Sequence, residues 1–177
     1  RAAEARDASG IAEILNWELV HGVAHFGEVP EPPDEVERQF HAEAHKYPWL
    51  VAVDFASDDV IGIARARPSK TRHGYDWTAE VSVYVRRDRL GKGVGRALYA
   101  ALFPELERRG FRCLIAGMTL PNPASKALHE SFGMRSIGVF PKVGHKHGVW
   151  RDVEYFSVHL GEGPPRPDGG VRPFRDS

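Results

Sequence analysis

Residues 78–99 constrain the fold more than any other part of this sequence. They begin with an alternating run in which Val81, Val83 and Val85 share one face, and this alternation predicts a β-strand. A short basic loop follows and then an apolar pattern at helical spacing; the glycines in this loop are Gly91, Gly93 and Gly95. A strand, a glycine turn and a helix N-terminus in this order form an anion-binding site, because backbone N–H groups and the positive end of the helix dipole point toward the anion. The sequence therefore predicts a phosphate-binding loop at the centre of the chain.

One carboxylate, Glu80, lies on the predicted strand that leads into this loop, on the face that it shares with Ser82 and Tyr84. A glutamate beside an anion site can act as a general base. The commoner fate of a strand glutamate is exposure to solvent or an ion pair. The residues alone leave both interpretations open.

The glycine loop does not fit the two common nucleotide motifs. A P-loop needs Gly-x-x-x-x-Gly-Lys-Ser/Thr, which the sequence lacks, and the dinucleotide fingerprint would need glycine where Arg96 or Leu98 stands. A flexible turn with incidental glycines is the alternative, because short glycine patterns are weak signals.

Length and charge limit the class of protein. The 177 residues suffice for one domain with a full core, and 24 basic residues balance 24 acidic ones, which argues against nucleic-acid and membrane partners. No apolar segment approaches the roughly 20 residues that span a bilayer, and the start has no signal-peptide character. The single Cys113 excludes an internal disulfide, so we predict a cytoplasmic protein in which Cys113 is a buried core thiol.

The periodicity of the first half predicts two helices and a hairpin. The first helix is expected over residues 7–21, capped by Asp7 or Ser9, and the second over residues 34–46, opened by a capping box of Asp34 and Glu37. Residues 49–54 and 60–67 read as the two strands of a hairpin.

In the second half, a helix is expected over residues 94–109, ended by Gly110 and kinked or shortened by Pro104. A strand buried on both faces (111–118), a short helix (125–132) and two final strands (134–140 and 149–160) follow. We expect one α+β domain over residues 1–160 and a loose Gly/Pro-rich tail over residues 161–177.

Residues 89–99, Arg-Leu-Gly-Lys-Gly-Val-Gly-Arg-Ala-Leu-Tyr, resemble the acetyl-CoA pyrophosphate loop of the GNAT N-acetyltransferase superfamily. Asn122 and residues 127–134 resemble its later motif. More narrowly, the chain resembles phosphinothricin acetyltransferases and their methionine-sulfoximine-acetylating relatives, on the strength of residues 47–52, 75–85, 120–122 and 146–153. Several separate motifs in the same order make this resemblance more specific than the glycine loop alone.

The resemblance implies a GNAT fold, an α/β/α layered α+β structure whose central mixed, mostly antiparallel twisted sheet is flanked by helices. It also implies an acetyl-CoA-dependent N-acetyltransferase that acts by direct transfer on the α-amine of a small amino-acid-like acceptor, of the phosphinothricin or methionine sulfoximine or sulfone type, and that forms a homodimer. The alternatives are an N-acetyltransferase for a polyamine, an aminoglycoside or a protein N-terminus, and a non-catalytic CoA-binding regulatory module.

The same resemblance assigns roles around the loop. Glu80 is the expected base, and His129 falls where many relatives have a thiolate-protonating group, although a neutral, packed histidine is the alternative. Asn122 is expected to contact the pantetheine arm or to cap the following helix. The residues expected to hold acetyl-CoA are Val83, Tyr84, Val85, Gly91, Lys92, Gly93, Val94, Gly95, Arg96 and Asn122.

The sequence departs from the family pattern at two places near the loop. Leu90 replaces a Gln or Arg, and Arg86, Arg87 or Arg89 is expected to substitute for it. His129 replaces a tyrosine, as also occurs in the phosphinothricin branch.

The acceptor pocket is expected to be cationic and walled by aromatic residues. Its predicted residues are Phe26, Lys70, Arg72, Tyr75, Trp77 and His147. Gly27 replaces an arginine of the family's pocket loop, next to His25. Arg65 and Arg67 are further anion contacts or belong to a solvated strand edge. No third ligand accompanies the closely spaced histidine pairs 41/45 and 145/147, so we expect no metal.

Overall fold

The computed structural model describes residues 1–161 and residue 171. A six-stranded sheet in the order β1-β2-β3-β4-β6-β5 forms its centre. The strands are β1 Trp49–Val53, β2 Val60–Pro68, β3 Thr78–Val85, β4 Cys113–Thr119, β5 Arg135–Lys146 and β6 Val149–His159. Neighbouring strands run antiparallel except β3 and β4, which are parallel. The predicted mixed, mostly antiparallel sheet is confirmed.

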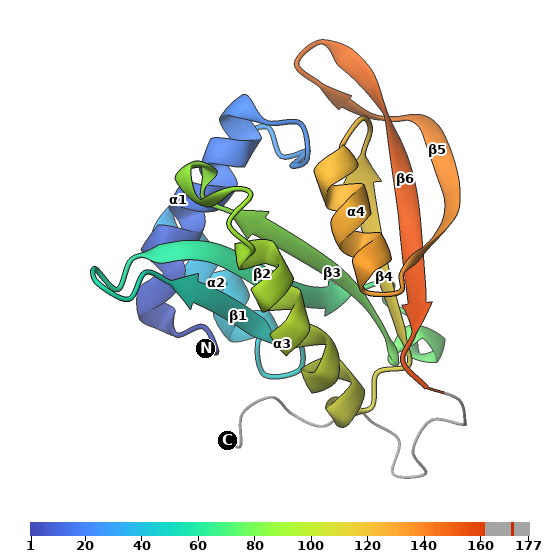
Figure 1. Ribbon diagram of the computed structural model, residues 1–177, viewed down its shortest axis with the longest axis horizontal. Helices are drawn as coiled ribbons and strands as arrows, with labels where there is room; N and C mark the ends of the chain where they lie inside the picture. The colour runs from blue at the N-terminus through green and yellow to red at the C-terminus, as the bar shows by residue number, and fades with distance from the viewer. Residues whose placement is uncertain (162–170, 172–177) are drawn as a thin grey trace.

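Helices cover both faces of this sheet. Within the described residues they are α1 Ala8–His21, α2 Pro33–Glu43, α3 Val94–Arg109 and α4 Pro123–Ser131, with short 3-10 turns η1 Ala5–Asp7, η2 His73–Tyr75 and η3 Arg87–Arg89. In Figure 1, α3 and α4 lie in front of the sheet and α1 and α2 lie behind it. The predicted α/β/α layering is therefore confirmed.

Two apolar clusters, one on each face, hold the layers together. On the front face, Leu98, Leu102 and Leu106 of α3 pack on small and aliphatic residues of the sheet. On the rear face, residues of α1 and α2 pack on Trp49 and Ile63. Each large side chain buried in this way contributes about 1.5–3 kcal/mol of transfer free energy. Because successive strand residues point to opposite faces, β2 supplies both clusters.

The opening between β3 and β4 is the feature of the sheet that matters for function. These parallel strands pair over only three residues each, Thr78–Glu80 with Cys113–Ile115. In contrast, β3 pairs with β2 as far as Val85, and β4 pairs with β6 as far as Thr119. Beyond Glu80 the two central strands therefore separate, at the carboxyl ends where open parallel sheets bind ligands.

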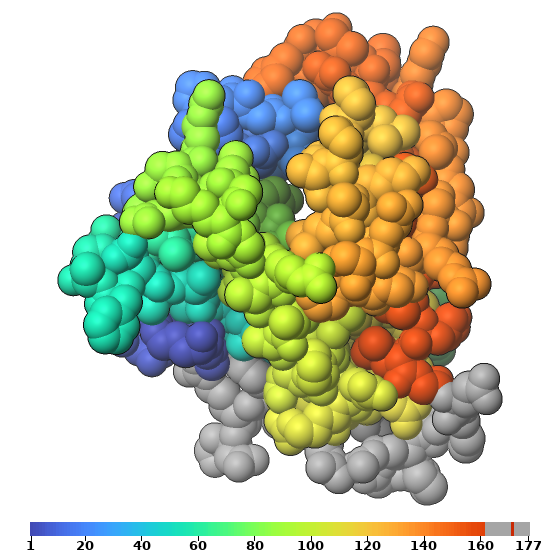
Figure 2. Space-filling view, in the orientation of Figure 1, coloured from blue at the N-terminus to red at the C-terminus, as the bar shows by residue number. Residues whose placement is uncertain are grey.

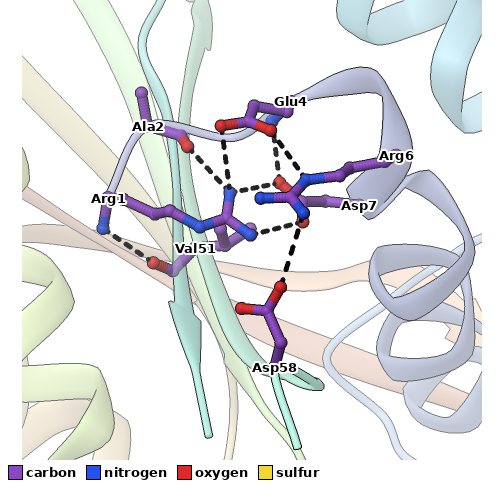
Figure 3. A network of polar contacts seen from close by, with 7 residues as sticks. All are labelled: Arg1, Ala2, Glu4, Arg6, Asp7, Val51 and Asp58. Atoms are coloured by element: carbon purple, nitrogen blue, oxygen red, sulfur yellow. Dashed lines mark hydrogen bonds and ion pairs between the residues drawn. The ribbon is translucent and has the colours of Figure 1, made fainter. Parts of the chain in front are cut away.

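Two predicted helix caps are wrong. The Asp7 carboxylate does not cap α1, because both of its oxygens accept from the Arg1 guanidinium at 2.8 Å and one also accepts from the Glu4 N–H (Figure 3). The second helix begins at Pro33, one residue before the expected start, and the side chain of its N-cap residue, Pro32, offers no acceptor. Proline suits this first position because its fixed φ is already helical.

The helix containing Pro104 does not end early. It runs from Val94 to Arg109 and stops at Gly110, whose φ of 106° is the left-handed conformation expected of a C-terminal glycine. One missing N–H donor does not outweigh the burial of the leucines that anchor this helix.

The other boundaries shift by a few residues. The fourth strand begins at Cys113, whose side chain is only half-buried, and Gly117 is exposed on one of its faces, so the predicted core thiol and doubly buried strand are wrong. The last helix begins at Pro123, earlier than expected, because Asn122 caps it. The fifth strand continues past Phe140 to Lys146 with an irregular register, which an edge strand containing Pro141 tolerates. Except for Gly161 and Val171, the predicted tail lies outside the described residues.

Candidate active site

A cavity of about 430 Å³ passes through the opening between β3 and β4. One wall is β3 from Val81 to Val85, and the facing wall is β4 from Gly117 to Thr119. The start of α3 and the face of α4 close it in front, and α1 contributes from behind. Figure 2 shows this hollow between the beginning of α3 and α4. It connects the two faces of the sheet.

The glycine turn forms one end of this cavity. Gly91 and Gly93 have φ of 71° and 80°, and a Cβ at either would meet nothing within 4 Å. Gly93 is the N-cap of α3, and no side chain caps the helix there. The first N–H groups of a helix have no partner inside it and carry the positive end of its dipole. This end of the cavity is therefore built to receive an anion.

A third glycine, Gly95, brings the two front helices together. A Cβ at this position would lie 3.4 Å from Leu128 of α4. The close approach keeps the cavity narrow next to the start of α3.

Only some of the basic side chains near the glycine turn line the cavity. Arg89 and Arg96 line the cavity, whereas Lys92 does not. Arg89 is held by Asp54, Arg86 by Asp88, and Arg87 lies 5.1 Å from the Trp17 ring. Of the three arginines expected to substitute for Leu90, Arg89 is thus the one at the cavity wall.

Three residues of β3 that were predicted to hold acetyl-CoA also lie on the cavity. Val83, Tyr84 and Val85 line it, and beyond Glu80 the β3 edge that faces β4 pairs with no strand among the described residues. Backbone groups on such an edge can bind an extended ligand in the manner of an added strand. Asn122 lines the cavity as well, and its side-chain oxygen accepts from the Ser125 N–H at 3.0 Å, so its capping role is observed.

His129 is buried on the cavity wall with only 3% of its surface exposed. Its Nε2 lies 3.2 Å from the Tyr99 hydroxyl, and its Nδ1 lies 3.3 Å from the Ser125 hydroxyl. The ring stacks on Phe156. Burial lowers the pKa of His129 below its ordinary value, so the ring is neutral at pH 7. A hydroxyl can donate or accept, and these two satisfy a neutral imidazole in either tautomer.

Two further cavities, of about 410 and 480 Å³, lie on the rear face of the sheet. They share five lining residues, namely Ala24, Phe26, Glu80, Ser82 and Tyr84. The Glu80 side chain is exposed and has neither an ion pair nor a hydrogen bond within the part of the chain that the structure describes. Its carboxylate is therefore free to meet a ligand in either cavity.

Two hydrogen bonds join the α1–α2 loop to the β5–β6 hairpin beside these cavities. The Lys146 ammonium donates to the Gly27 carbonyl at 2.7 Å, and His147 Nε2 donates to the Gly22 carbonyl at 3.0 Å. His147 thus anchors the loop and does not line a cavity, whereas Phe26 lines both. A Cβ at Gly27 would lie 2.8 Å from the end of the Leu19 side chain and 2.9 Å from the His25 ring, so a larger residue there would require these side chains to move.

The remaining predicted acceptor residues lie apart from these cavities. Lys70, Arg72 and Tyr75 are exposed in and before η2, and Trp77 is half-buried with its ring 5.6 Å from that of His73. None of the four lines a cavity described above. Their role in binding the acceptor stays a prediction.

Several lining residues carried no signal in the sequence. Tyr155 of β6 and Thr119 of β4 line the larger rear cavity, and Tyr155 pairs with Gly117 across the two strands. Tyr99 reads as an ordinary core residue of an apolar helix, yet its hydroxyl reaches His129. Only the sheet order could have brought Tyr155 to the site.

The described residues contain no group of three or more His, Cys, Asp or Glu side chains that could hold a metal ion. Within the same residues, none of the helices combines the length and apolar character needed to cross a membrane.

Comparison with known proteins gives consistent matches. Residues 11–134 match the Acetyltransferase (GNAT) family. The chain is 37% identical to the phosphinothricin N-acetyltransferase of Streptomyces viridochromogenes over 98% of this chain and 92% of that protein. It is 35% identical to the L-methionine sulfoximine/L-methionine sulfone acetyltransferase of Pseudomonas paraeruginosa over 90% of this chain and 93% of that protein.

Among solved structures, the chain is similar to a GNAT superfamily phosphinothricin acetyltransferase from Sinorhizobium meliloti in complex with AcCoA. The TM-score is 0.90 and the identity 35%, over 97% of this chain and 93% of that chain. The likeness therefore extends over nearly the whole chain.

Proposed function

This chain belongs to the GNAT acetyltransferase family, and from that membership we propose that it acetylates the α-amine of a small amino-acid-like acceptor. It is an N-acetyltransferase that uses acetyl-CoA as cosubstrate. The acceptor class that we propose is that of phosphinothricin and of methionine sulfoximine and sulfone, after the relatives that carry those names.

The residues of the front cavity fit acetyl-CoA. The glycine turn and the uncapped start of α3 offer N–H groups for a pyrophosphate, and the unpaired edge of β3 from Val83 to Val85 offers an extended backbone for a pantetheine arm. When bound, acetyl-CoA supplies an acetyl thioester. Asn122 completes this wall while it caps α4.

We assign the role of general base to Glu80. An amine attacks a thioester only after its ammonium form has lost a proton, and a carboxylate within reach can accept that proton directly or through a water. Glu80 stands at the last residue pair of β3 and β4, where the strands begin to separate. An amine deprotonated on the rear face thus lies beside the opening that leads to the front cavity, which suits direct transfer without a covalent enzyme intermediate.

The Tyr99–His129 pair is our candidate for the group that protonates the departing thiolate. Both residues line the front cavity, and they are hydrogen-bonded to each other. In this step the S–H bond forms as a ring N–H bond of His129 breaks, and the proton that the amine loses to Glu80 balances the one that the thiol gains. Burial raises the pKa of the Tyr99 hydroxyl, so Tyr99 stays protonated and orients the ring.

We further propose that residues 1–160 form one catalytic domain that works as a homodimer in the cytoplasm. Exposed apolar side chains gather on the β5–β6 hairpin, which rises at one edge of the molecule in Figure 1; they are Ile137, Val139, Phe140, Val143, Val149 and Trp150. An apolar surface of this kind marks a site of protein association. The lone cysteine is compatible with a reducing compartment.

The observation that carries the proposal is the Glu80 carboxylate, which has no ion pair or hydrogen bond within the described residues and lines both rear cavities at the point where β3 and β4 separate. The test is thiol release from acetyl-CoA over a panel of amines: phosphinothricin, methionine sulfoximine, methionine sulfone, a polyamine, an aminoglycoside and a peptide N-terminus. Turnover with the first three supports the proposal. Turnover confined to the last three, or acetyl-CoA binding without turnover on any amine, contradicts it.

A further inference from the structure

One buried cation on the smaller rear cavity has neither a hydrogen bond nor an ion pair within the described residues. The Arg65 side chain is 4% exposed, and its Nε and Nη1 atoms are buried without a hydrogen-bond partner within the described residues. The guanidinium lies 4.8 Å from the Trp49 ring, which supports it from one side. Arg65 also lines the smaller rear cavity together with Glu80.

Such an arrangement is costly unless something compensates for it. An ionised group removed from water needs an opposite charge or several hydrogen bonds, and a guanidinium stays protonated in proteins. Burial and the neighbouring Arg67 lower the pKa of Arg65 from its ordinary value, as expected for a charge without an adequate counterion. The same surroundings act on His25, whose pKa is lowered by burial and then by Arg65.

The other cations near this cavity already have partners. Arg67 donates to Glu43 at 3.2 Å, and Lys146 donates to the Gly27 carbonyl. Two carboxylates share this cavity with Arg65. Glu80 has no ion pair within the described residues, whereas Glu43 accepts from Arg67 through Oε1 and keeps a buried Oε2 without a hydrogen-bond partner. Arg65 itself has neither an ion pair nor a hydrogen bond within the described residues, so it is available to a ligand.

The strand register sets the spacing of these two charges. Arg65 pairs with Ser82 and Arg67 pairs with Glu80 across β2 and β3, so Arg65 and Glu80 are diagonal neighbours on the rear face. The Cα atoms of diagonal neighbours are roughly 7–8 Å apart, and both side chains are long enough to meet one small ligand. In an α-amino acid a single carbon separates the ammonium from the carboxylate, which matches one cation and one carboxylate opening on the same cavity.

We propose that Arg65 binds the α-carboxylate of the acceptor while Glu80 takes its α-ammonium, so that the pair selects zwitterionic α-amino acids. The inference rests on the proposed function and names how its acceptor is held. A guanidinium and a carboxylate form a bidentate, charge-assisted pair. Such a pair attracts the acceptor and also fixes the position of its α-amine. Because position 27 of the α1–α2 loop is a glycine, this cation comes from strand β2 and not from the loop.

The test compares two acceptors on two enzymes. Methionine sulfoximine and its α-carboxamide differ in the carboxylate charge, and Arg65→Met removes the cation while keeping an apolar chain over Trp49. On wild type the acid is expected to have a kcat/KM about 10²-fold above the amide, a ratio typical of a lost charged contact. On Arg65→Met the acid is expected to fall to the level of the amide, whereas the amide changes little.

Arg38→Met is the matched control, because Arg38 is exposed on α2 and paired with Glu35. It should leave both acceptors unchanged. Equal losses for acid and amide on Arg65→Met would overturn the proposal. A loss that instead follows the distal anion, seen by comparing phosphinothricin with methionine sulfoximine, would also overturn it.

A binding experiment separates this proposal from the proposed function. Calorimetric titration of the CoA-saturated protein with methionine sulfoximine and with its amide needs no turnover. Preference of wild type for the acid, abolished by Arg65→Met, supports the proposal even if no amine is acetylated. Failure of wild type to prefer the acid overturns it.

Thermal unfolding without ligand distinguishes binding from a structural role. Replacing an uncompensated buried charge by an apolar side chain is expected to leave the midpoint unchanged or raise it. A clear drop in the midpoint would show that Arg65 supports the fold and would count against the assignment.

Discussion

At the scale of single residues, the site depends on polar groups that the fold leaves without partners. Glu80 and Arg65 carry opposite charges into one cavity, and neither has an ion pair among the described residues. Most buried polar groups in proteins are hydrogen-bonded, so the unsatisfied, buried Arg65 at a cavity wall points to a ligand, whereas the exposed Glu80 is simply accessible to one. Their neighbours Arg67 and Glu43 pair with each other through Glu43 Oε1, although Glu43 Oε2 is buried without a hydrogen-bond partner within the described residues.

The variant Glu80→Gln keeps the size of the side chain and removes its ability to accept a proton. We expect kcat to fall by about 10²-fold or more, the usual scale of acid–base catalysis, while the affinity for acetyl-CoA stays the same. Glu37→Gln is the control, since Glu37 is a partly exposed glutamate on α2 beside His41 and lines none of the cavities described above. Near-normal turnover of Glu80→Gln would remove this residue from the mechanism.

The burial of His129 predicts how the stability of the protein depends on pH. Burial lowers its pKa in the folded protein, whereas an unfolded histidine titrates near pH 6.5. The unfolded state therefore binds the proton more readily, so stability is fully present above about pH 6.5 and decreases as the pH falls below it. The slope is at most about 1.4 kcal/mol per pH unit for one such group.

Chemical denaturation at pH 7.5 and pH 5.5 measures this effect. His129→Gln should lose less stability between the two pH values than wild type does, because it has no imidazole to protonate. An unchanged pH dependence in the variant would mean that His129 does not titrate as its burial requires.

At the scale of secondary-structure elements, we propose that the turn between β3 and α3 binds the pyrophosphate of acetyl-CoA. Gly93 caps α3 at a φ of 80°, where an L-residue is strained although a Cβ would meet no atom within 4 Å. Gly93→Ala should therefore raise the KM for acetyl-CoA by about tenfold or more, through about 1–2 kcal/mol of strain and a methyl group in the anion site.

Gly74→Ala is the matched control for this element. Gly74 lies in η2, has no positive φ, and a Cβ there would also meet nothing within 4 Å. It should bind acetyl-CoA as wild type does. If Gly93→Ala does so too, the turn is not the pyrophosphate site.

Much of this architecture could be predicted from local pattern. Alternating valines predicted β3, and apolar spacing with Gly110 at the end predicted α3, because these signals depend on neighbours within a few residues. The helix N-caps were harder to predict. Asp7 is of a residue type that commonly caps helices, but the Arg1 guanidinium and the Glu4 N–H donate to its oxygens instead (Figure 3).

The parts that escaped prediction depend on contacts distant in sequence. Nothing local marks Glu80 as the residue where β3 leaves β4, since the partner strand lies more than thirty residues away. The sequence left Arg65 as either an anion contact or a solvated strand residue. Its burial next to Trp49 is visible only in the folded structure. Lys70, Arg72 and Tyr75 were placed by resemblance alone, and the cavities described here do not include them.

At the scale of the whole molecule, the opening in the sheet links two surfaces with different chemistry. The front face offers glycine N–H groups and a free strand edge, and the rear face offers Glu80 and Arg65. Because the strands separate just beyond Glu80, a ligand on one face can reach a ligand on the other without leaving the protein. We regard this passage as the structural basis of direct transfer.

The proposed dimer is tested at the same scale. Phe140 on the β5–β6 hairpin is 55% exposed, and Phe140→Asp should convert a dimer at micromolar concentration into a monomer in sedimentation equilibrium. Phe55→Asp, at a fully exposed phenylalanine between β1 and β2, should leave the dimer intact. A wild-type protein that sediments as a monomer would contradict the proposal.

The central claim is that Glu80 prepares an α-amine for acetylation. The most direct test is mass spectrometry of the product made from acetyl-CoA and methionine sulfoximine labelled at its α-nitrogen. We predict that wild type places the acetyl group on the labelled nitrogen and that Glu80→Gln, although still protected from unfolding by acetyl-CoA, forms about 10²-fold less product in the same time. Acetylation at another atom, or equal product from both enzymes, would contradict the account.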